Sequence, residues 1–158
     1  MPTAAATITR PNDVNAYAAN DVIGAATGST AAIEFANIGP ADGGPLLVRG
    51  VSLRIDAAAV IASEAAYRLH LYDVTPPSAL GDNAAWDLPA GDRASYQGYV
   101  DISAPVDLGS TLWIEMSALA KPVKTRTGSL WAYLTTIAGY TPTALRVHEI
   151  DLHTETRL

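Results

Sequence analysis

Short runs of alternating apolar and polar residues, separated by turn-forming residues, recur along the chain. In one such run Val51, Leu53 and Ile55 share one parity, and polar residues occupy the positions between them. A β-strand directs successive side chains to opposite faces, so this run predicts a strand with one face in a core. The same pattern predicts strands near Thr7–Arg10, Asp21–Ile23, Ala31–Ile38, Leu46–Ile55, Tyr67–Tyr72, Tyr96–Ile102, Thr111–Met116, Val123–Thr125, Leu130–Leu134 and Ala144–His153.

Two of these strands contain a change of phase. Leu46 and Val48 are out of phase with Val51, and Gly50 lies between them, where a β-bulge would restore the alternation. The last strand has a similar change between Val147 and Ile150, with no glycine beside it.

The number of short strands, without helical periodicity, predicts an all-β fold. A mostly antiparallel pattern with a few long connections favours a jelly-roll-like β-sandwich over an immunoglobulin-like one. A chain of 158 residues fits a single domain. We expect residues 13–158 to form the sandwich, and residues 1–12 to be either an N-terminal arm or the first strand.

One connection, from Val74 to Ser95, is longer than ordinary loops, and such loops tend to be functional. We expect a short helical turn around Ser78–Leu80 within it, because a serine that follows proline is a good N-cap.

The charge and composition of the chain exclude several classes of partner and site. A net charge of −6, with ten basic residues that form no run, argues against binding to nucleic acid. The absence of cysteine excludes disulfides and thiolate metal sites, and suits assembly in a reducing cytoplasm. No window approaches the roughly 20 apolar residues of a membrane span, so we expect no membrane partner. The opening residues also lack the features of a signal peptide.

The histidines do not form a catalytic or metal-binding pattern. A catalytic triad would need a histidine beside a buried aspartate and an activated serine, and no G-x-S-x-G elbow is present. His148, Asp151 and His153 are of metal-ligand type, but His148 and His153 have opposite parity and point to opposite strand faces unless a bulge intervenes. The simpler interpretation is that the histidines lie on solvated strand faces or in subunit contacts.

Carboxylates in and near the long loop have an equally simple interpretation. Asp82 with Asp87, or Asp92 with Asp101, resemble the acid pairs of glycosidases. Asp82, Asn83 and Asp87 carry the oxygen ligands that calcium prefers. The ligand order of an EF-hand is missing, and loop aspartates usually cap turns. We therefore predict no catalytic residue, cofactor or metal, and no enzyme.

The aromatic residues are more informative. Trp113, Trp131 and Tyr133 lie on the strand faces opposite the aliphatic residues, where they would be available to a partner. If the assignment of faces is inverted in one of these strands, its aromatic residues lie in the core instead. For Trp113 and Trp131 the pattern does not decide between an outward position and a core position. Trp86 is expected to pack the long loop onto its own domain, with a partner contact as the alternative. Arg10 and Pro11, in the N-terminal stretch, complete the candidate interface.

Several strings resemble a group of small tailed-bacteriophage proteins. The opening ITRPNDVNAYAANDVIG is similar to their pattern T-R-P…Y-x-A-x-D-V-[IV]-G, and LHLYDVTPPSA, DNAAWDLPAGDR and DLGST are similar to the same group. The resemblance extends from Ile8 to about Tyr140. It implies a virion structural protein, encoded near the major capsid protein, and brings no catalytic residues.

The function implied by this resemblance is capsid decoration. Such a cement protein, made in the bacterial cytoplasm, would stabilise the outer capsid surface by bridging subunits of the major capsid protein, as a homotrimer. The alternative is a tail, baseplate or fibre-associated module that binds a host-surface glycan, because aromatic platforms and loop carboxylates also suit sugars.

Overall fold

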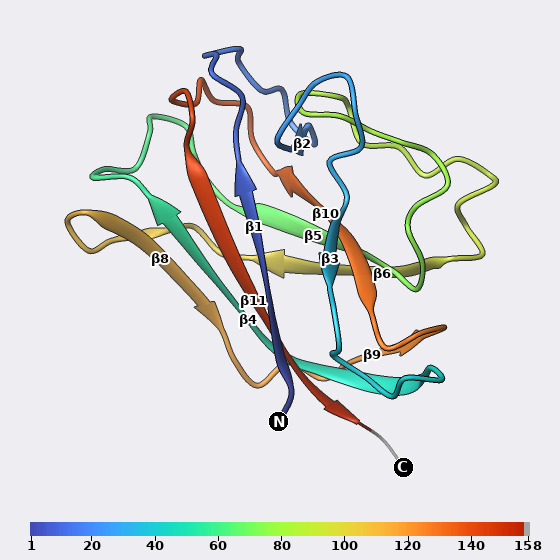
Figure 1. Cartoon of the computed structure of the whole chain (residues 1–158). Coiled ribbons are helices and arrows are strands. Elements are labelled where there is room, and N and C mark those ends of the chain that lie inside the picture. Colours follow the sequence, from blue (N-terminus) through green and yellow to red (C-terminus); the bar gives the residue numbers. More distant parts are fainter. Residues whose placement is uncertain (157–158) are drawn as a thin grey trace.

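A computed structural model describes residues 1–156, which fold into two antiparallel β-sheets packed face to face (Figure 1). The larger sheet contains β1 (Thr3–Thr9), β4 (Gly44–Asp56), β7 (Val106–Asp107), β8 (Thr111–Met116), β9 (Lys121–Thr125) and β11 (Val147–Thr156). The smaller sheet contains β2 (Val22–Ile23), β3 (Ile33–Phe35), β5 (Tyr67–Tyr72), β6 (Tyr96–Ile102) and β10 (Leu130–Thr136). None of the residues described is helical, so this part of the chain has no helix that could cross a membrane. The predicted all-β sandwich is confirmed.

The strand order is that of a jelly roll. The larger sheet has the order β1-β11-β4-β8-β7, with β9 beside the first half of β4, and the smaller has β2-β10-β5-β6, with β3 also on β10. Taken in chain order, the eight main strands are β1, β3, β4, β5, β6, β8, β10 and β11. The first, eighth, third and sixth then form one sheet, and the second, seventh, fourth and fifth form the other, which is the arrangement of two interlocked Greek keys.

The core lies between the two sheets and is built by the alternation seen in the sequence. Val51, Leu53 and Ile55 of β4 are completely buried, as are Leu69 and Leu71 of β5. Each such side chain contributes about 1.5–3 kcal/mol through its removal from water.

The bulge predicted at Gly50 is confirmed. On β11, His153 pairs with Gly50 and Thr154 pairs with Val48, so Arg49 is an extra residue on β4. Val48 and Val51 are both fully buried as a result. β4 also changes neighbour here, from β9 before the bulge to β8 after it.

The expected phase change in the last strand is wrong. Leu145 precedes β11, has a positive φ of 57° and is 54% exposed. His148, Ile150 and Leu152 share one parity and are all fully buried. The sequence pattern was misleading because a histidine, and not an aliphatic residue, occupies the first inward position.

The expected helical turn at Ser78–Leu80 is also wrong. Ser78 bonds to Asp92, through its backbone N–H at 3.2 Å and its hydroxyl at 3.0 Å. This contact holds the loop in a bend instead. At the other end of the chain, residues 3–9 form β1, which pairs with β11 along its whole length.

Candidate binding surface

Asp82 anchors the long loop in the interior of the protein. Its Oδ1 accepts hydrogen bonds from the Tyr17 hydroxyl at 2.6 Å and from the Gly24 backbone N–H at 2.8 Å. Its Oδ2 lies 3.3 Å from Nη2 of Arg10, and both side chains of this ion pair are fully buried. Arg10 also donates to the Tyr17 hydroxyl. Burial raises the pKa of Tyr17, so its hydroxyl remains a donor. We call these four residues the Asp82 clamp.

Backbone hydrogen bonds join the same two segments. The N–H of Val22 donates to the carbonyl of Ala84 at 2.8 Å, and the N–H of Trp86 donates to the carbonyl of Asn20 at 3.0 Å. Residues 10–26 and 80–86 are therefore fastened together. These segments contain most of the opening string and the whole of the DNAAW string that resemble phage proteins.

The clamp corrects the expectation that Arg10 lies at an outer interface. Arg10 is 1% exposed, because its guanidinium compensates the buried carboxylate of Asp82. Pro11 is half-buried, and its carbonyl accepts a hydrogen bond from the Leu145 N–H at 3.1 Å. The side chain of Arg10 thus belongs to the interior of the chain.

The long loop covers the outer face of the smaller sheet and buries Tyr133. The Tyr133 hydroxyl donates to the Ser78 carbonyl at 3.0 Å and accepts from the Leu80 N–H at 3.1 Å. Its ring packs edge-on against Tyr72, with centroids 5.9 Å apart. Tyr133 does point to the outer face, but the expectation that it is open to a partner is wrong because the loop forms a second apolar layer there.

Trp86 packs the loop onto the domain, as the sequence indicated. Its ring stacks on His70 with centroids 3.7 Å apart and an interplanar angle of 15°, and its Nε1 donates to the Tyr72 hydroxyl at 3.3 Å. His70 Nδ1 lies 3.0 Å from the Tyr96 hydroxyl. Burial lowers the pKa of His70 to about 3, so the ring is neutral and presents an uncharged stacking surface.

A second bulge, which the sequence analysis missed, gathers two tyrosines beside His70. Tyr96 and Tyr99 have opposite parity in β6, yet their ring centroids lie 6.0 and 6.1 Å from that of His70. Gln97 is an extra residue without a partner on β5, and Gly98 has a φ of +88°, which favours glycine. The signal in the sequence was a glycine inside a predicted strand.

The result is a cluster at the surface that we call the β5–β6 patch, in which Tyr99 and Asp101 are exposed and the others half-buried: Arg68, Trp86, Tyr96, Tyr99 and Asp101. Tyr99 is 46% exposed, and the Arg68 guanidinium lies 4.0 Å from its ring centroid. Asp101 accepts from Nε of Arg68 at 2.6 Å and from Nη2 at 3.2 Å. Tryptophan, tyrosine and arginine are the residue types enriched in interface hot spots. Arg68 is held in place by two neighbours, so little conformational entropy remains to be lost on binding.

The other two tryptophans are half-buried on outer sheet faces. Trp131 packs against the Tyr72 and Tyr133 cluster under the long loop. Trp113 lies on the larger sheet, paired with Val106 of the edge strand β7. Val106 is 60% exposed, so Trp113 belongs to a small apolar strip at this edge.

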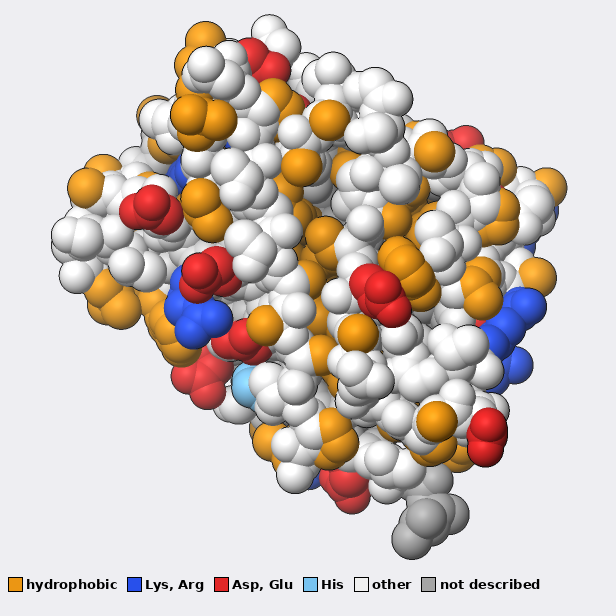
Figure 2. All heavy atoms as spheres, viewed as in Figure 1, with side chains coloured by type: hydrophobic (Ala, Val, Ile, Leu, Met, Phe, Trp, Pro, Cys, Tyr) orange, Lys and Arg blue, Asp and Glu red, His pale blue; other side chains and the backbone are white. Residues whose placement is uncertain are grey.

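The outer face of the larger sheet is otherwise polar and mainly acidic. Arg54 lies 3.1 Å from Glu149 and 2.9 Å from Asp151. Figure 2 shows acidic side chains gathered around basic ones on the left side of the view, over β4, β8 and β11. Salt bridges this exposed contribute about 0–1 kcal/mol each.

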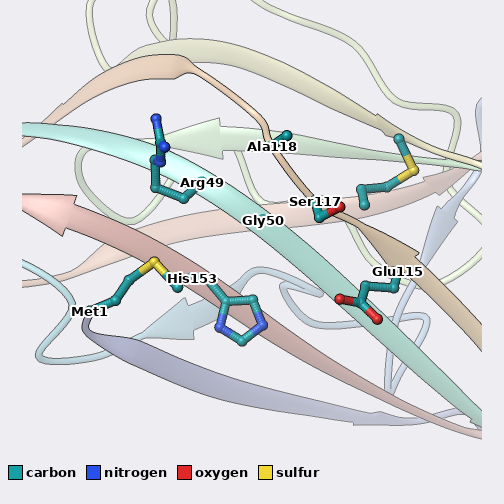
Figure 3. Close-up of a pocket in the computed structure, with 8 residues that line it drawn as sticks. Met1, Arg49, Gly50, Glu115, Ser117, Ala118 and His153 are labelled. Carbon is teal, nitrogen blue, oxygen red and sulfur yellow. The ribbon is translucent and has the colours of Figure 1, made fainter.

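A pocket of about 390 Å³ opens on this face beside the Gly50 bulge (Figure 3). Gly50, on β4, lies at the centre of the pocket, with Arg49, Glu115 and His153 around it. His153 Nδ1 lies 2.9 Å from the Thr3 hydroxyl. The pocket combines these charged or polar groups with the apolar side chains of Met1 and Met116.

The structure separates the carboxylates that the sequence analysis paired. Asp82 is held in the clamp, Asp92 holds Ser78, and Asp101 pairs with Arg68. Asp87 is exposed. No group of three histidine, aspartate or glutamate side chains positioned for a metal occurs within residues 1–156.

A buried polar cluster inside the sandwich was not foreseen. Arg146 donates to the Glu64 carboxylate at 3.0 Å, and the Tyr67 hydroxyl bonds to the same carboxylate. His148 is fully buried nearby, and neither ring nitrogen has a partner among the residues described. Burial, reinforced by Arg146, lowers the pKa of His148 to about 3. The shared parity of His148 and Ile150 was the available signal.

Comparison with known proteins gives matches among solved structures, at low sequence identity. No family model matches the chain. No curated protein sequence matches it either. Among solved structures, the Kashmir bee virus virion at acidic pH aligns with 98% of this chain and 71% of its own, at 16% identity and a TM-score of 0.27. The Israel acute paralysis virus pentamer aligns over 70% of this chain and 58% of its own, at 13% identity and a TM-score of 0.21. The PRD1 vertex protein P5 aligns over 85% of this chain and 96% of its own, at 11% identity and a TM-score of 0.21. Likeness at this level establishes neither a shared fold nor a shared function.

Proposed function

We propose that this protein is a non-enzymatic structural protein of a tailed-bacteriophage particle. In this role it binds the outer capsid surface and bridges neighbouring subunits of the major capsid protein. The observation that carries the proposal is the convergence of Arg10, Tyr17 and Gly24 on Asp82. Three of these residues belong to the opening string that resembles phage virion proteins, and the fourth begins the DNAAW string. A resemblance located in the residues that hold the fold together supports a shared scaffold.

The architecture suits a protein that must hold neighbouring subunits together under load. The jelly roll has a core between its sheets and a second apolar layer under the long loop. Two sets of buried contacts therefore resist deformation of the smaller sheet, the sheet that carries the β5–β6 patch. Several such copies bound to one shell would gain avidity from their high effective concentration.

The distribution of charge suggests an orientation on the particle. We place the β5–β6 patch against the shell, because its Trp86, Tyr99 and Arg68 are of the hot-spot types. The acidic face of the larger sheet, with Glu149 and Asp151, then points away from the particle. A net charge of −6 is compatible with this outer location and disfavours contact with packaged DNA.

A glycan-binding role in the tail is the second candidate, and one observation favours it. Tyr99 presents an exposed ring beside the polar groups of Arg68 and Asp101, which is the arrangement used to stack and hydrogen-bond a sugar. Against it, Trp86 has one ring face covered by His70.

Binding to particles that lack this protein tests the proposal. Purified protein is mixed with such particles, sedimented and quantified. We expect saturable binding that Tyr99→Ala and Arg68→Ala each weaken about tenfold or more, as hot-spot substitutions do. Val14→Ala serves as the control, because Val14 is 61% exposed and lies outside the patch. Wild-type protein that fails to bind the shell, but binds a glycan array in a Tyr99-dependent manner, would favour the tail role instead.

A further inference from the structure

Nearly every sheet edge in the described chain carries a feature that discourages pairing with another strand. Short length, charge, proline and bulges are the usual protections. The strands β2, β3 and β7 contain only two or three residues, β6 has its bulge at Gln97, and β9 contains Pro122 between two lysines. β1 is the exception. It has seven residues, Thr3–Thr9, with no charge, no proline and no bulge.

The free edge of β1 presents unpaired backbone groups. Pro2 accepts a hydrogen bond from the Thr154 N–H, and the Arg10 N–H donates to the Arg146 carbonyl, so even-numbered positions face β11. Backbone direction alternates along an antiparallel strand. The four odd-numbered residues therefore direct N–H and C=O groups away from β11: Thr3, Ala5, Thr7 and Thr9. All four are exposed.

No other element of the described chain occupies these groups. β3 contacts β1, but it belongs to the other sheet, and no backbone hydrogen bond joins the two strands. A hollow of about 160 Å³ lies between Thr7, Ile8 and residues 30–33. In Figure 1, β1 is the last strand of its sheet: β11 lies along one side of it, and no strand of the same sheet lies along the other.

We infer that β1 pairs with β1 of a second copy, antiparallel, about a two-fold axis at Ala6. In this register Thr3 lies opposite Thr9 of the other copy, and Ala5 lies opposite Thr7. Every pair joins two odd-numbered residues, so each free N–H meets a free C=O, giving about eight backbone hydrogen bonds. Threonines opposite one another are favourable cross-strand neighbours.

Charge does not oppose this pairing. The nearest row of outward carboxylates, Glu149 and Asp151, lies on β11, behind β1. In the joined sheet the two copies of this row are three strand spacings apart, about 14 Å. That separation exceeds the Debye length of about 8 Å at physiological ionic strength. The uncharged edge can therefore meet its own copy despite the net charge of −6.

The inferred contact has a definite stoichiometry. A two-fold contact uses the same surface on both copies and closes at two. It therefore replaces the homotrimer expected from the sequence with a dimer, and it goes beyond the proposed function because it concerns the free protein. A dimer would carry two β5–β6 patches and so bind a shell bivalently.

Light scattering coupled to size exclusion, over a range of protein concentrations, tests the inference. We expect a mass of twice the 16.5 kDa chain. Ala5→Pro removes one free-edge N–H and leaves the hydrogen bonds to β11 intact, so dimerisation should weaken at least tenfold. Ala5→Val, which keeps the N–H, is the matched control and should remain dimeric.

A second variant guards against misfolding. Ala5→Glu places a carboxylate from each copy at the joined edge and should also give monomers, with a circular dichroism spectrum like that of the wild type. A wild-type monomer or trimer at high concentration would overturn the inference. So would a dimer that persists unchanged in Ala5→Pro and Ala5→Glu. Binding to particles by a monomeric wild type would leave the proposed function standing without the dimer.

Discussion

The Tyr17 hydroxyl donates a 2.6 Å hydrogen bond to the carboxylate of Asp82, which lies 65 residues further along the chain. Arg10 reaches the same carboxylate from the end of β1. Through this contact, the segment that follows the first strand fastens the long loop over the outer face of the smaller sheet. The position of Trp86, and with it one side of the β5–β6 patch, depends on that loop.

Removing the carboxylate should therefore cost much of the stability of the fold. Asp82→Ala leaves the charge of Arg10 buried without compensation, and such losses typically cost about 3–5 kcal/mol. Urea unfolding followed by tryptophan fluorescence measures the difference. Asp87→Ala, in the same loop but exposed, is the control and should change stability by less than about 0.5 kcal/mol. Equal effects of the two substitutions would contradict the clamp.

The bulge in β6 requires glycine at position 98. Gly98→Ala forces an alanine to adopt a φ of +88° and brings its Cβ to 2.4 Å from the Lys121 Nζ. We therefore expect the free energy of unfolding to fall by about 1–3 kcal/mol. The substitution should also move Tyr99 and weaken binding through the patch. Gly91→Ala is the control, because its Cβ would meet nothing within 4 Å. Thermal unfolding of both variants decides the matter, and a neutral Gly98→Ala would mean that the bulge is absent.

Stability should fall in acid because of His148. A histidine in the unfolded chain has a pKa near 6.5, whereas burial lowers that of His148 to about 3 in the folded chain. The unfolded chain then binds the proton more readily. The stabilisation is complete above about pH 6.5 and is lost as the pH falls towards 3, by about 1.4 kcal/mol per pH unit for this one group.

Replacing the ring tests this pH dependence. His148→Leu should flatten the fall in unfolding free energy between pH 6 and pH 3, measured by denaturant titration at each pH. His70, with a similarly lowered pKa, should still contribute its own slope. His153→Leu, on the half-exposed outer side of β11, is the matched control and should still show the fall that His148 causes. An unaltered slope in His148→Leu would show that His148 is not buried as described.

Trp86 should control the opening of the long loop. Trp86→Ala removes the stack on His70, and we expect a loss of about 2 kcal/mol, below the value for a fully buried tryptophan. Hydrogen exchange at the Leu80 amide, which donates to Tyr133, should become faster. Trp113→Ala lies on the other sheet and should leave this amide protected. Unchanged exchange in Trp86→Ala would argue against the stack.

Strand positions and the core of the larger sheet could be predicted because alternation reports burial directly. Val51, Leu53 and Ile55 are aliphatic and all face inward. The glycine between two phases of β4 also marked its bulge correctly. Where an inward position holds a polar residue, as His148 does in β11, the same reasoning placed the wrong residues inside.

The outer face of the smaller sheet could not be predicted, because alternation describes one strand and not what covers it. Tyr133 has the parity of an outward residue and is nevertheless buried under a loop some fifty residues earlier in the chain. Tyr96 and Tyr99 have opposite parity and share a face only because of the bulge at Gln97. The burial of Arg10 similarly depends on partners elsewhere in the chain, above all Asp82.

The central claim is tested most directly by cryo-electron microscopy of intact phage particles purified from cells that make this protein. We predict density for the jelly roll on the outer capsid surface, between subunits of the major capsid protein, with Arg68, Trp86 and Tyr99 facing the shell. A bare capsid surface, with the protein found in the tail or missing from the particle, would contradict the claim.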